Sequence, residues 1–147
     1  MSESATPVVT PPPQRLYTVS CHCGGVKFQA QMEKELTKGH RCNCSSCFKT
    51  RMWVHPVSDL STFKMMTPEE NVSQYVYNTK MCEHYFCKTC GTQTHMMGDC
   101  PGYGRYILAS INCLEELTQE EFSNIKFRYA DGINSNFMDV PKYTNHL

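Results

Sequence analysis

Residues 41–50 read RCNCSSCFKT and place three cysteines, Cys42, Cys44 and Cys47, within six residues. A closed structural zinc site takes four protein ligands, and disulfides take cysteines in pairs. Three cysteines therefore imply either a fourth ligand elsewhere in the chain or a coordination position without a protein ligand. Which of the two holds decides both how the domain is stabilised and what chemistry it can perform.

Four more cysteines stand in two pairs, each followed by a glycine. The stretch SCHCGG carries Cys21 and Cys23, and FCKTCG carries Cys87 and Cys90. Two cysteines at this spacing on a tight turn can face one ion, and zinc favours thiolates in tetrahedral geometry. Glycine tolerates the backbone conformations of such a turn. The two pairs predict one closed Cys₄ zinc site that ties the start of the domain to its middle.

For the middle cluster the spacing leaves three interpretations open. Three protein ligands with one exchangeable position are the arrangement of a catalytic zinc. Alternatively, a fourth ligand closes the site, and the candidates are His40, His84, His95 and Cys82. In the third interpretation the chain holds a single zinc and the remaining cysteines are buried.

Composition narrows the class of protein. The chain has 147 residues, enough for one domain with a modest core, and its 14 basic and 14 acidic residues balance. A neutral chain argues against nucleic-acid binding, which favours a basic surplus. We find no secretory signal and no apolar run of about 18 to 20 residues, so we expect a cytoplasmic protein without membrane contact. In that reducing compartment the ten cysteines favour metal ligation; secretion would instead allow five disulfides.

The chain divides into a tail and one domain. Residues 1–14 hold four of the eight prolines and predict a disordered tail, followed by a zinc-binding domain over residues 15–143. Short alternating apolar segments with turn signals between them predict strands. The segments are 16–23, 25–32, 52–57, 72–78, 83–87, 92–97, 105–112 and 125–130.

These strands predict an all-β fold of small, zinc-stapled antiparallel sheets, arranged as a twisted sandwich or partial barrel. One short helix is expected over residues 112–125, with Asn112 as the N-cap and Glu115 completing an approximate capping box. Residues 131–147 have little periodicity and are expected to form loops.

Three segments in order, CHCGGVKF, CNCSSC and HYFCKTCGT, resemble the glutathione-dependent formaldehyde-activating enzyme family, which also contains centromere protein V. The closing DGIN and VPKY are similar to a C-terminal signature of that family, and the resemblance runs from about Tyr17 to Tyr143. It implies a small all-β protein with two zinc ions. The structural zinc would lie on Cys21, Cys23, Cys87 and Cys90, and the catalytic zinc on Cys42, Cys44 and Cys47, with its open position toward the thiol substrate.

The resemblance also implies a carbon–sulfur lyase reaction, in which glutathione and formaldehyde reversibly give S-(hydroxymethyl)glutathione. A free thiol is mostly protonated at neutral pH, and coordination to zinc deprotonates it. An acid must protonate the alkoxide that forms when the thiolate adds to the aldehyde. The candidates are His84, Tyr85, His55 and His95, each of which has an ordinary hydrogen-bonding role as its alternative.

Basic residues flank the middle cluster. Arg41, Lys49 and Arg51 are candidates to bind the glutathione carboxylates, with a solvated basic edge as the alternative. Trp53 is the only tryptophan and is a candidate wall of the substrate pocket or a core residue. Two other functions remain open. One is a zinc lyase or isomerase for another small carbonyl or thiol substrate, and the other is a non-catalytic zinc scaffold. The sequence carries no signal for an oligomeric state.

Overall fold

The computed structural model describes residues 10–147. Of the tail expected over residues 1–14, residues 1–9 lie outside the described part of the chain; residues 10–13 are exposed, and Gln14 already begins a strand. None of the described helices is long and apolar enough to span a bilayer.

Ten strands and two short α-helices form the described chain, together with three single-turn 3₁₀ helices. The strands are β1 (Gln14–Ser20), β2 (Lys27–Glu33), β3 (Lys38–Cys42), β4 (Val54–Pro56), β5 (Asp59–Met65), β6 (Val72–Val76), β7 (Cys82–Cys87), β8 (Gln93–Cys100), β9 (Gly104–Ser110) and β10 (Lys126–Ala130). The helices are α1 (Ser45–Thr50), α2 (Gln119–Ser123), η1 (Glu69–Asn71), η2 (Ile111–Cys113) and η3 (Gly132–Asn134).

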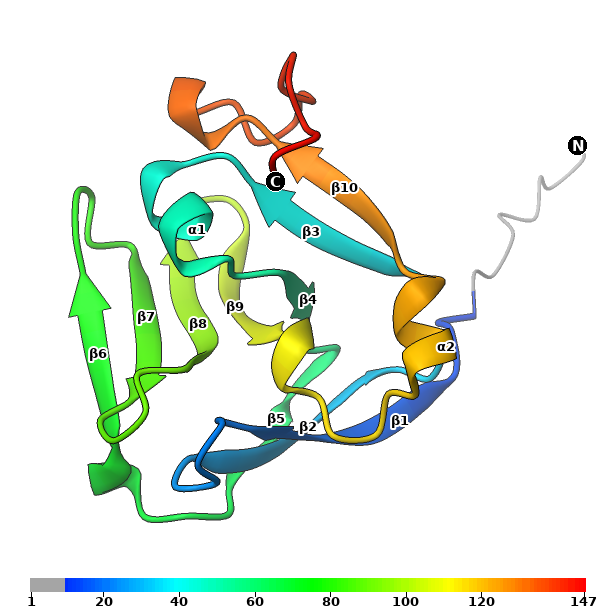
Figure 1. Ribbon diagram of the computed structural model, residues 1–147, viewed down its shortest axis with the longest axis vertical. Coiled ribbons are helices and arrows are strands. Elements are labelled where there is room, and N and C mark those ends of the chain that lie inside the picture. The colour runs from blue at the N-terminus through cyan, green and yellow to red at the C-terminus, as the bar shows by residue number, and fades with distance from the viewer. Residues whose placement is uncertain (1–9) are drawn as a thin grey trace, which may run out of the picture.

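The strands form two sheets. Strands β1, β2 and β5 make a three-stranded sheet, and the order β10-β3-β4-β9-β8-β7-β6 makes a seven-stranded sheet. In Figure 1 the smaller sheet runs along the bottom of the view and the larger sheet curves above it. The predicted all-β class is confirmed. The expectation of purely antiparallel sheets holds except for β3 and β10, which pair in parallel. After β9 the chain passes through η2 and α2 to β10. Strand β10 then lies along the edge of β3 and runs in the same direction as β3.

The main core lies between the two sheets. In β2 the side chains of Phe28, Ala30 and Met32 are fully buried and alternate with polar residues, as the sequence pattern predicted. Tyr17 and Val19 of β1 pair with Ala30 and Phe28 and are buried on the same side. The three-stranded sheet therefore presents one continuous apolar face to the larger sheet.

The expected helix over residues 112–125 is wrong in its length and in its cap. The helix in this region, α2, covers only Gln119–Ser123. Thr118 is its N-cap: the hydroxyl of Thr118 accepts from the Glu121 N–H at 3.1 Å, and the Glu121 carboxylate accepts from the Thr118 N–H at 2.8 Å. This reciprocal capping box outcompetes the looser match at Asn112.

The residues before Thr118 are held away from helical geometry by tertiary contacts. Asn112 lies in the 3₁₀ turn η2, and the N–H of Glu115 donates to the carbonyl of Thr18 at 3.0 Å. The segment after η2 is thus hydrogen-bonded to β1, so its amides are not available for an α-helix.

Candidate functional site

The first and third cysteine pairs meet in one place. The sulfur atoms of Cys21, Cys23, Cys87 and Cys90 all lie within 4.8 Å of one another. The Sγ–Sγ distances of Cys21–Cys23 and Cys23–Cys87 are both 3.6 Å. Tetrahedral zinc with Zn–S bonds near 2.3 Å places its sulfurs about 3.8 Å apart. The four thiols therefore fit a closed metal site.

Two tight turns, each closed by a glycine N–H, build this site. The N–H of Gly24 donates to the carbonyl of Cys21, and the N–H of Gly91 donates to the carbonyl of Cys87. The φ angles of the two glycines, 77° and 71°, are ones that L side chains rarely adopt. The first turn follows β1 and the second follows β7, so a metal here joins the smaller sheet to the larger one.

The middle cluster lies where β3 meets α1. The sulfurs of Cys42, Cys44 and Cys47 lie within 4.8 Å of one another and are half-buried. Cys44 is the N-cap of α1; its sulfur accepts from the Cys47 N–H at 3.5 Å, while its own N–H donates to the Cys42 sulfur at 3.4 Å. Contacts with the Cys42 and Cys47 side chains lower the pKa of the Cys44 thiol. Contact with Cys44 raises the pKa of Cys42, and contacts with Cys42 and Cys44 raise the pKa of Cys47. Cys44 is therefore the cluster thiol most readily present as thiolate, the form that binds metal.

In the described part of the chain, no histidine, carboxylate or further cysteine joins the three thiols of the middle cluster. The four candidates for a closing ligand, which are His40, His84, His95 and Cys82, all lie outside the group. The donor set of three thiols fits a metal ion that keeps one position for an exchangeable ligand.

A loop distant in sequence packs on the middle cluster. The side chain of Asn43 donates to the Asp131 carboxylate at 2.8 Å and accepts from the N–H of Ile133 at 3.0 Å. Between them, Gly132 lies so close that a Cβ there would be 2.8 Å from the Cβ of Cys44 and would also clash with the Cys42 sulfur. These supporting residues were not among the predicted site residues. The Asp-Gly pair in DGIN was the available signal, since the tight approach requires glycine.

Tyr77 is another residue near the middle cluster that was not predicted from the sequence. It follows β6, and its hydroxyl lies beside Cys44 and Ser46. Burial, with the Cys44 thiolate adding to it, raises the pKa of Tyr77 to about 12, so the phenol is protonated at neutral pH. Its sequence distance from the cluster gave no indication of this contact; the pairing of β6 with β7 creates it.

Of the four predicted acids, His84 lies beside Tyr77, on the side of the sheet that faces the middle cluster. His84 is buried, and its ring lies 5.4 Å from that of Tyr77. Its Nδ1 is 2.9 Å from the side-chain nitrogen of Gln93. Burial lowers the pKa of His84, and the nearby Cys44 thiolate partly opposes this shift. Gln93 thus holds the ring in place through Nδ1, and Nε2 is the ring nitrogen that is left for proton transfer.

The other three acids lie on the opposite face of the sheet, toward the main core. Tyr85 follows His84 in β7 and stacks on His95 at 4.6 Å, and its hydroxyl donates to Glu83. His95 is 1% exposed and also packs on Phe28 at 4.8 Å. His55, in β4, is buried with its Nδ1 2.8 Å from the carbonyl of Pro56. The structure does not bring these three side chains to the cysteines.

The two predicted arginines line a small cavity beside the middle cluster. The Arg41 guanidinium packs against the rings of both Trp53 and Phe127, with its central carbon 3.7 Å from each centroid. The cavity measures about 10 Å³, and its walls are Arg41, Cys42, Cys47, Phe48, Arg51, Met52, Trp53 and Leu147. Trp53 thus supports a guanidinium beside the cysteines. Lys49 lies on the exposed last turn of α1.

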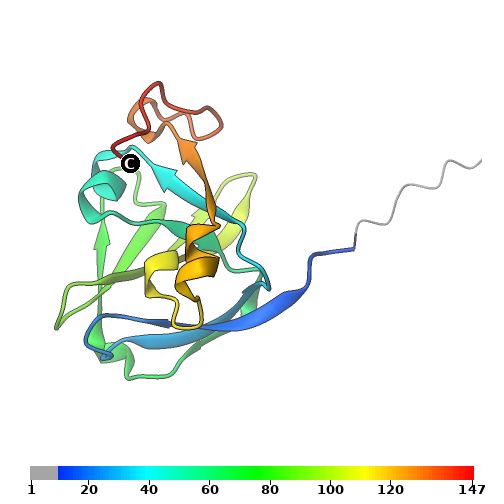
Figure 2. The ribbon, with the colours of Figure 1, turned by 45° about the vertical axis from the view of Figure 1, so that its right-hand side comes forward.

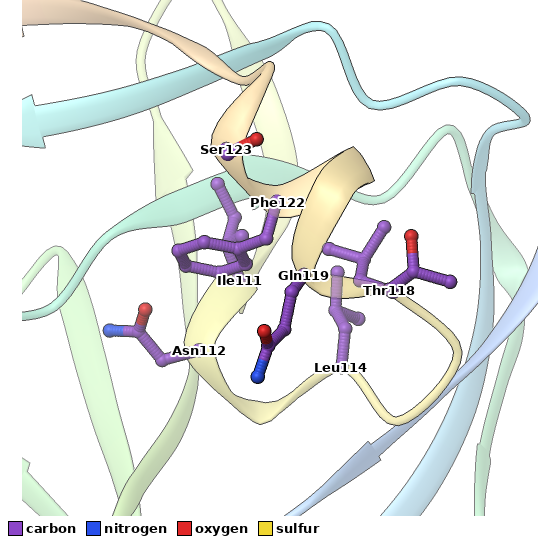
Figure 3. A pocket seen from close by; sticks show the side chains of 8 residues that line it. Ile111, Asn112, Leu114, Thr118, Gln119, Phe122 and Ser123 are labelled. Carbon is purple, nitrogen blue, oxygen red and sulfur yellow. The ribbon is translucent and has the colours of Figure 1, made fainter.

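A larger cavity of about 320 Å³ lies elsewhere, between η2 and α2. Figure 3 shows Ile111, Leu114 and Phe122 around it together with small polar side chains. Its walls contain neither cysteine, histidine nor any charged residue, so it offers none of the groups that thiol or carbonyl chemistry needs.

Comparisons with known proteins agree with this geometry. The family profile described as "Glutathione-dependent formaldehyde-activating enzyme" matches residues 16–127. A curated protein of Emericella nidulans, named "Putative glutathione-dependent formaldehyde-activating enzyme", is 27% identical over 80 residues, which are 53% of this chain. That match spans only 40% of the relative's length. A crystal structure of a Rhodobacter sphaeroides protein matches 76% of this chain and 99% of its own, with a TM-score of 0.63 and 23% identity, and so shares the fold.

Proposed function

The chain belongs to the glutathione-dependent formaldehyde-activating enzyme family, and from this premise we propose that it is a zinc-dependent carbon–sulfur lyase. The proposed reaction is the reversible addition of glutathione to formaldehyde, which gives S-(hydroxymethyl)glutathione. The observation that carries the proposal is the middle cluster, where Cys42, Cys44 and Cys47 converge without a fourth protein ligand among the described residues.

Two zinc ions per chain fit the donor sets. Four convergent thiols at Cys21, Cys23, Cys87 and Cys90 suit a closed structural site. The three thiols of the middle cluster suit a site that accepts the substrate sulfur. A zinc ion bound there would favour the thiolate form of that sulfur and polarise a carbonyl oxygen. All ten cysteines are free thiols, which fits a reducing, cytoplasmic location.

His84 and Tyr77 are the residues that we assign to the proton transfers. In the forward reaction the thiol loses its proton, the sulfur–carbon bond forms, the C=O π bond breaks and the oxygen takes up a proton. Neutral His84 can take the thiol proton and, as the imidazolium, give a proton to this oxygen, so that the ring ends neutral, while the Gln93 side chain holds Nδ1 in place. The Tyr77 phenol beside Cys44 can donate a hydrogen bond that orients the aldehyde oxygen. In the reverse reaction His84 takes the proton back.

Arg41 and Arg51 are the residues that we assign to the carboxylates of glutathione, with Lys49 at the outer edge. The two guanidiniums share one small cavity with Cys42 and Cys47. Bidentate arginine–carboxylate pairs are strong and directional. They would set the position of the thiol relative to the cluster.

The first test is native mass spectrometry of the full chain, with and without glutathione, on the wild type and on two variants. Cys44→Ser should lose one zinc and the glutathione adduct while it keeps the fold, because Cys44 serves only the middle site. Cys87→Ser should destabilise the whole domain, because it breaks the link between the two sheets. Equal unfolding of both variants would make the middle site structural and would remove the main support for an enzyme.

A second candidate keeps the same site and changes the substrate. Arg41 and Arg51 are suited to a carboxylate as such, and many small thiols and carbonyl compounds carry one. A lyase or isomerase acting on such a compound would bind zinc and lose activity in Cys44→Ser, but would show no turnover with glutathione and formaldehyde. Retained fold and zinc with no turnover of any thiol would favour a zinc scaffold.

A further inference from the structure

The last residues of the chain lie against the middle cluster. In Figures 1 and 2 the segment at the C label runs beside α1 and the end of β3, although about 100 positions separate them in sequence. Backbone oxygens of this segment accept from both arginines of the small cavity: Arg41 Nη1 donates to Leu147 at 2.7 Å, and Arg51 Nη1 donates to His146 at 2.6 Å.

Side-chain contacts hold the segment in this position. The His146 ring packs edge-on against Phe48 of α1, with 5.6 Å between centroids. Leu147 forms one wall of the cavity and leaves about 10 Å³, which is at most the space of one water molecule. The cavity beside Cys42 and Cys47 is thus nearly filled by the chain itself.

Arg41 carries more hydrogen-bonding capacity than this contact uses. Its Nε is buried and has no hydrogen-bond partner. A buried donor without an acceptor is unfavourable, and a guanidinium is suited to a carboxylate that accepts two bonds at once. The aromatic rings of Trp53 and Phe127 pack against this guanidinium and limit its movement. The site is therefore prepared for an acceptor that gives the Arg41 guanidinium more than the one oxygen atom it receives from Leu147.

We propose that residues 144–147 act as a displaceable strap on the substrate site, in which the backbone oxygens of His146 and Leu147 occupy the place of the substrate's carboxylate. This inference rests on the proposed function and extends it. The ligand class is a small thiol that carries a carboxylate, since the same cavity presents two guanidiniums and two cluster cysteines. A substrate carboxylate can accept two bonds from one guanidinium, whereas the strap gives each arginine a single backbone oxygen, so the substrate can displace the strap.

The strap lowers the apparent affinity for the thiol because only the strap-open fraction of the protein can bind. A chain that ends at Tyr143 should bind glutathione about fivefold or more tightly than the full chain, as measured by calorimetry on the zinc-loaded proteins. His146→Ala loses the contact with Phe48 and should shift the affinity in the same direction by a smaller factor. His146→Phe keeps an aromatic ring there and is the matched control, with the affinity of the wild type.

Two further measurements assign the effect to the carboxylate site. Glutathione diethyl ester lacks the carboxylates and should gain no affinity from the truncation. A peptide with the sequence of residues 141–147 should weaken glutathione binding to the truncated chain by competition. Should truncation cost stability, His146→Ala decides the question in the full-length chain.

The outcomes separate the strap from the proposed function. Equal glutathione affinity in the full chain, the truncated chain and His146→Ala would overturn the strap and leave the proposed function standing. No glutathione binding by any of these proteins, with two zincs retained, would overturn both.

Discussion

The side-chain amide of Asn43 donates to the Asp131 carboxylate at 2.8 Å and so joins the cysteine loop to a loop 88 positions later in the sequence. Asn43 is buried, and its oxygen accepts from the N–H of Ile133. With both of its polar groups satisfied by one loop, this side chain fixes the distance between the cluster and that loop.

We expect Asn43→Ala to destabilise the protein by about 1–3 kcal/mol, because it removes both hydrogen bonds of a buried side chain, one of them to a carboxylate. The middle site should also release zinc more readily to a chelator. Urea unfolding and chelator competition measure the two effects. Asn136→Ala is the matched control: it removes a similar bond to Asp139 at 2.6 Å on the exposed surface. A loss no larger than that of the control would contradict this role for Asn43.

Gly132→Ala tests the close packing on the middle cluster. The added methyl group would lie 2.8 Å from the Cβ of Cys44 and would press on the Cys42 sulfur. Either the loop or the two cysteines must move, so we expect one zinc per chain to be lost while the site on Cys87 and its partners stays filled. Native mass spectrometry counts the ions. If Gly132→Ala keeps two zinc ions and releases them to a chelator as slowly as the wild type does, the loop can move aside without disturbing the cysteines, which would contradict this prediction.

His95 should make the protein sensitive to acid. Burial lowers the pKa of His95 to about 4, whereas an unfolded histidine titrates near 6.5. Between these values the unfolded chain binds the extra proton, so the free energy of unfolding falls as the pH falls from 6.5 toward 4. Tyr85, the titratable group stacked on it, has a pKa raised to about 12, mainly by burial, and stays neutral throughout.

The control for this titration is His95→Gln, which retains a hydrogen-bonding side chain near Thr94 and has no proton to gain. Between pH 7 and pH 4.5 the wild type should lose about 2 kcal/mol more than the variant, as measured by urea unfolding. Zinc release at low pH affects both proteins, so the difference between them isolates His95. Parallel pH profiles would show that another group causes the acid sensitivity.

His84→Gln should lower turnover about 100-fold if His84 transfers the proton to the aldehyde oxygen. Zinc content and glutathione affinity should stay near those of the wild type, because His84 lies outside the group of metal-ligating side chains. His55→Gln is the comparison: His55 is buried on the opposite face, so stability should fall while turnover per folded molecule is retained. An equal loss of turnover in both variants would count against a specific role for His84.

The cysteine spacing predicted the site better than it predicted the rest of the fold. The pairs at Cys21 and Cys87 form the group of four expected from their turn glycines, because local chain geometry sets where such sulfurs point. The eight predicted strand segments are all present. Two strands were missed, β3 and β5. In β3 the residue that faces the core is Gly39, and the side chains of Ile111 and Phe127 fill the space beside it. Because glycine has no side chain, β3 lacks the alternating apolar pattern that predicts a strand.

The partners of the middle cluster escaped prediction for a similar reason. Helix α1 has only six residues and no buried side chain, so it carries no apolar stripe. Tyr77 and Gly132 reach the cysteines through strand pairing, a property of the whole sheet. The candidate acids were chosen by residue type and, for His84, by its position three residues before Cys87; the alternation along β7 is what separates His84 from Tyr85.

The parallel pairing of β3 with β10 also sets an order of assembly. Its register places Ala130 beside Cys42, so the loop that supports the middle cluster begins where β10 ends. All seven clustered cysteines precede Gly91, and thus leave the ribosome well before this loop does. A nascent chain can therefore bring its four-cysteine group together first, whereas the three-cysteine group acquires its supporting wall only when synthesis is nearly finished.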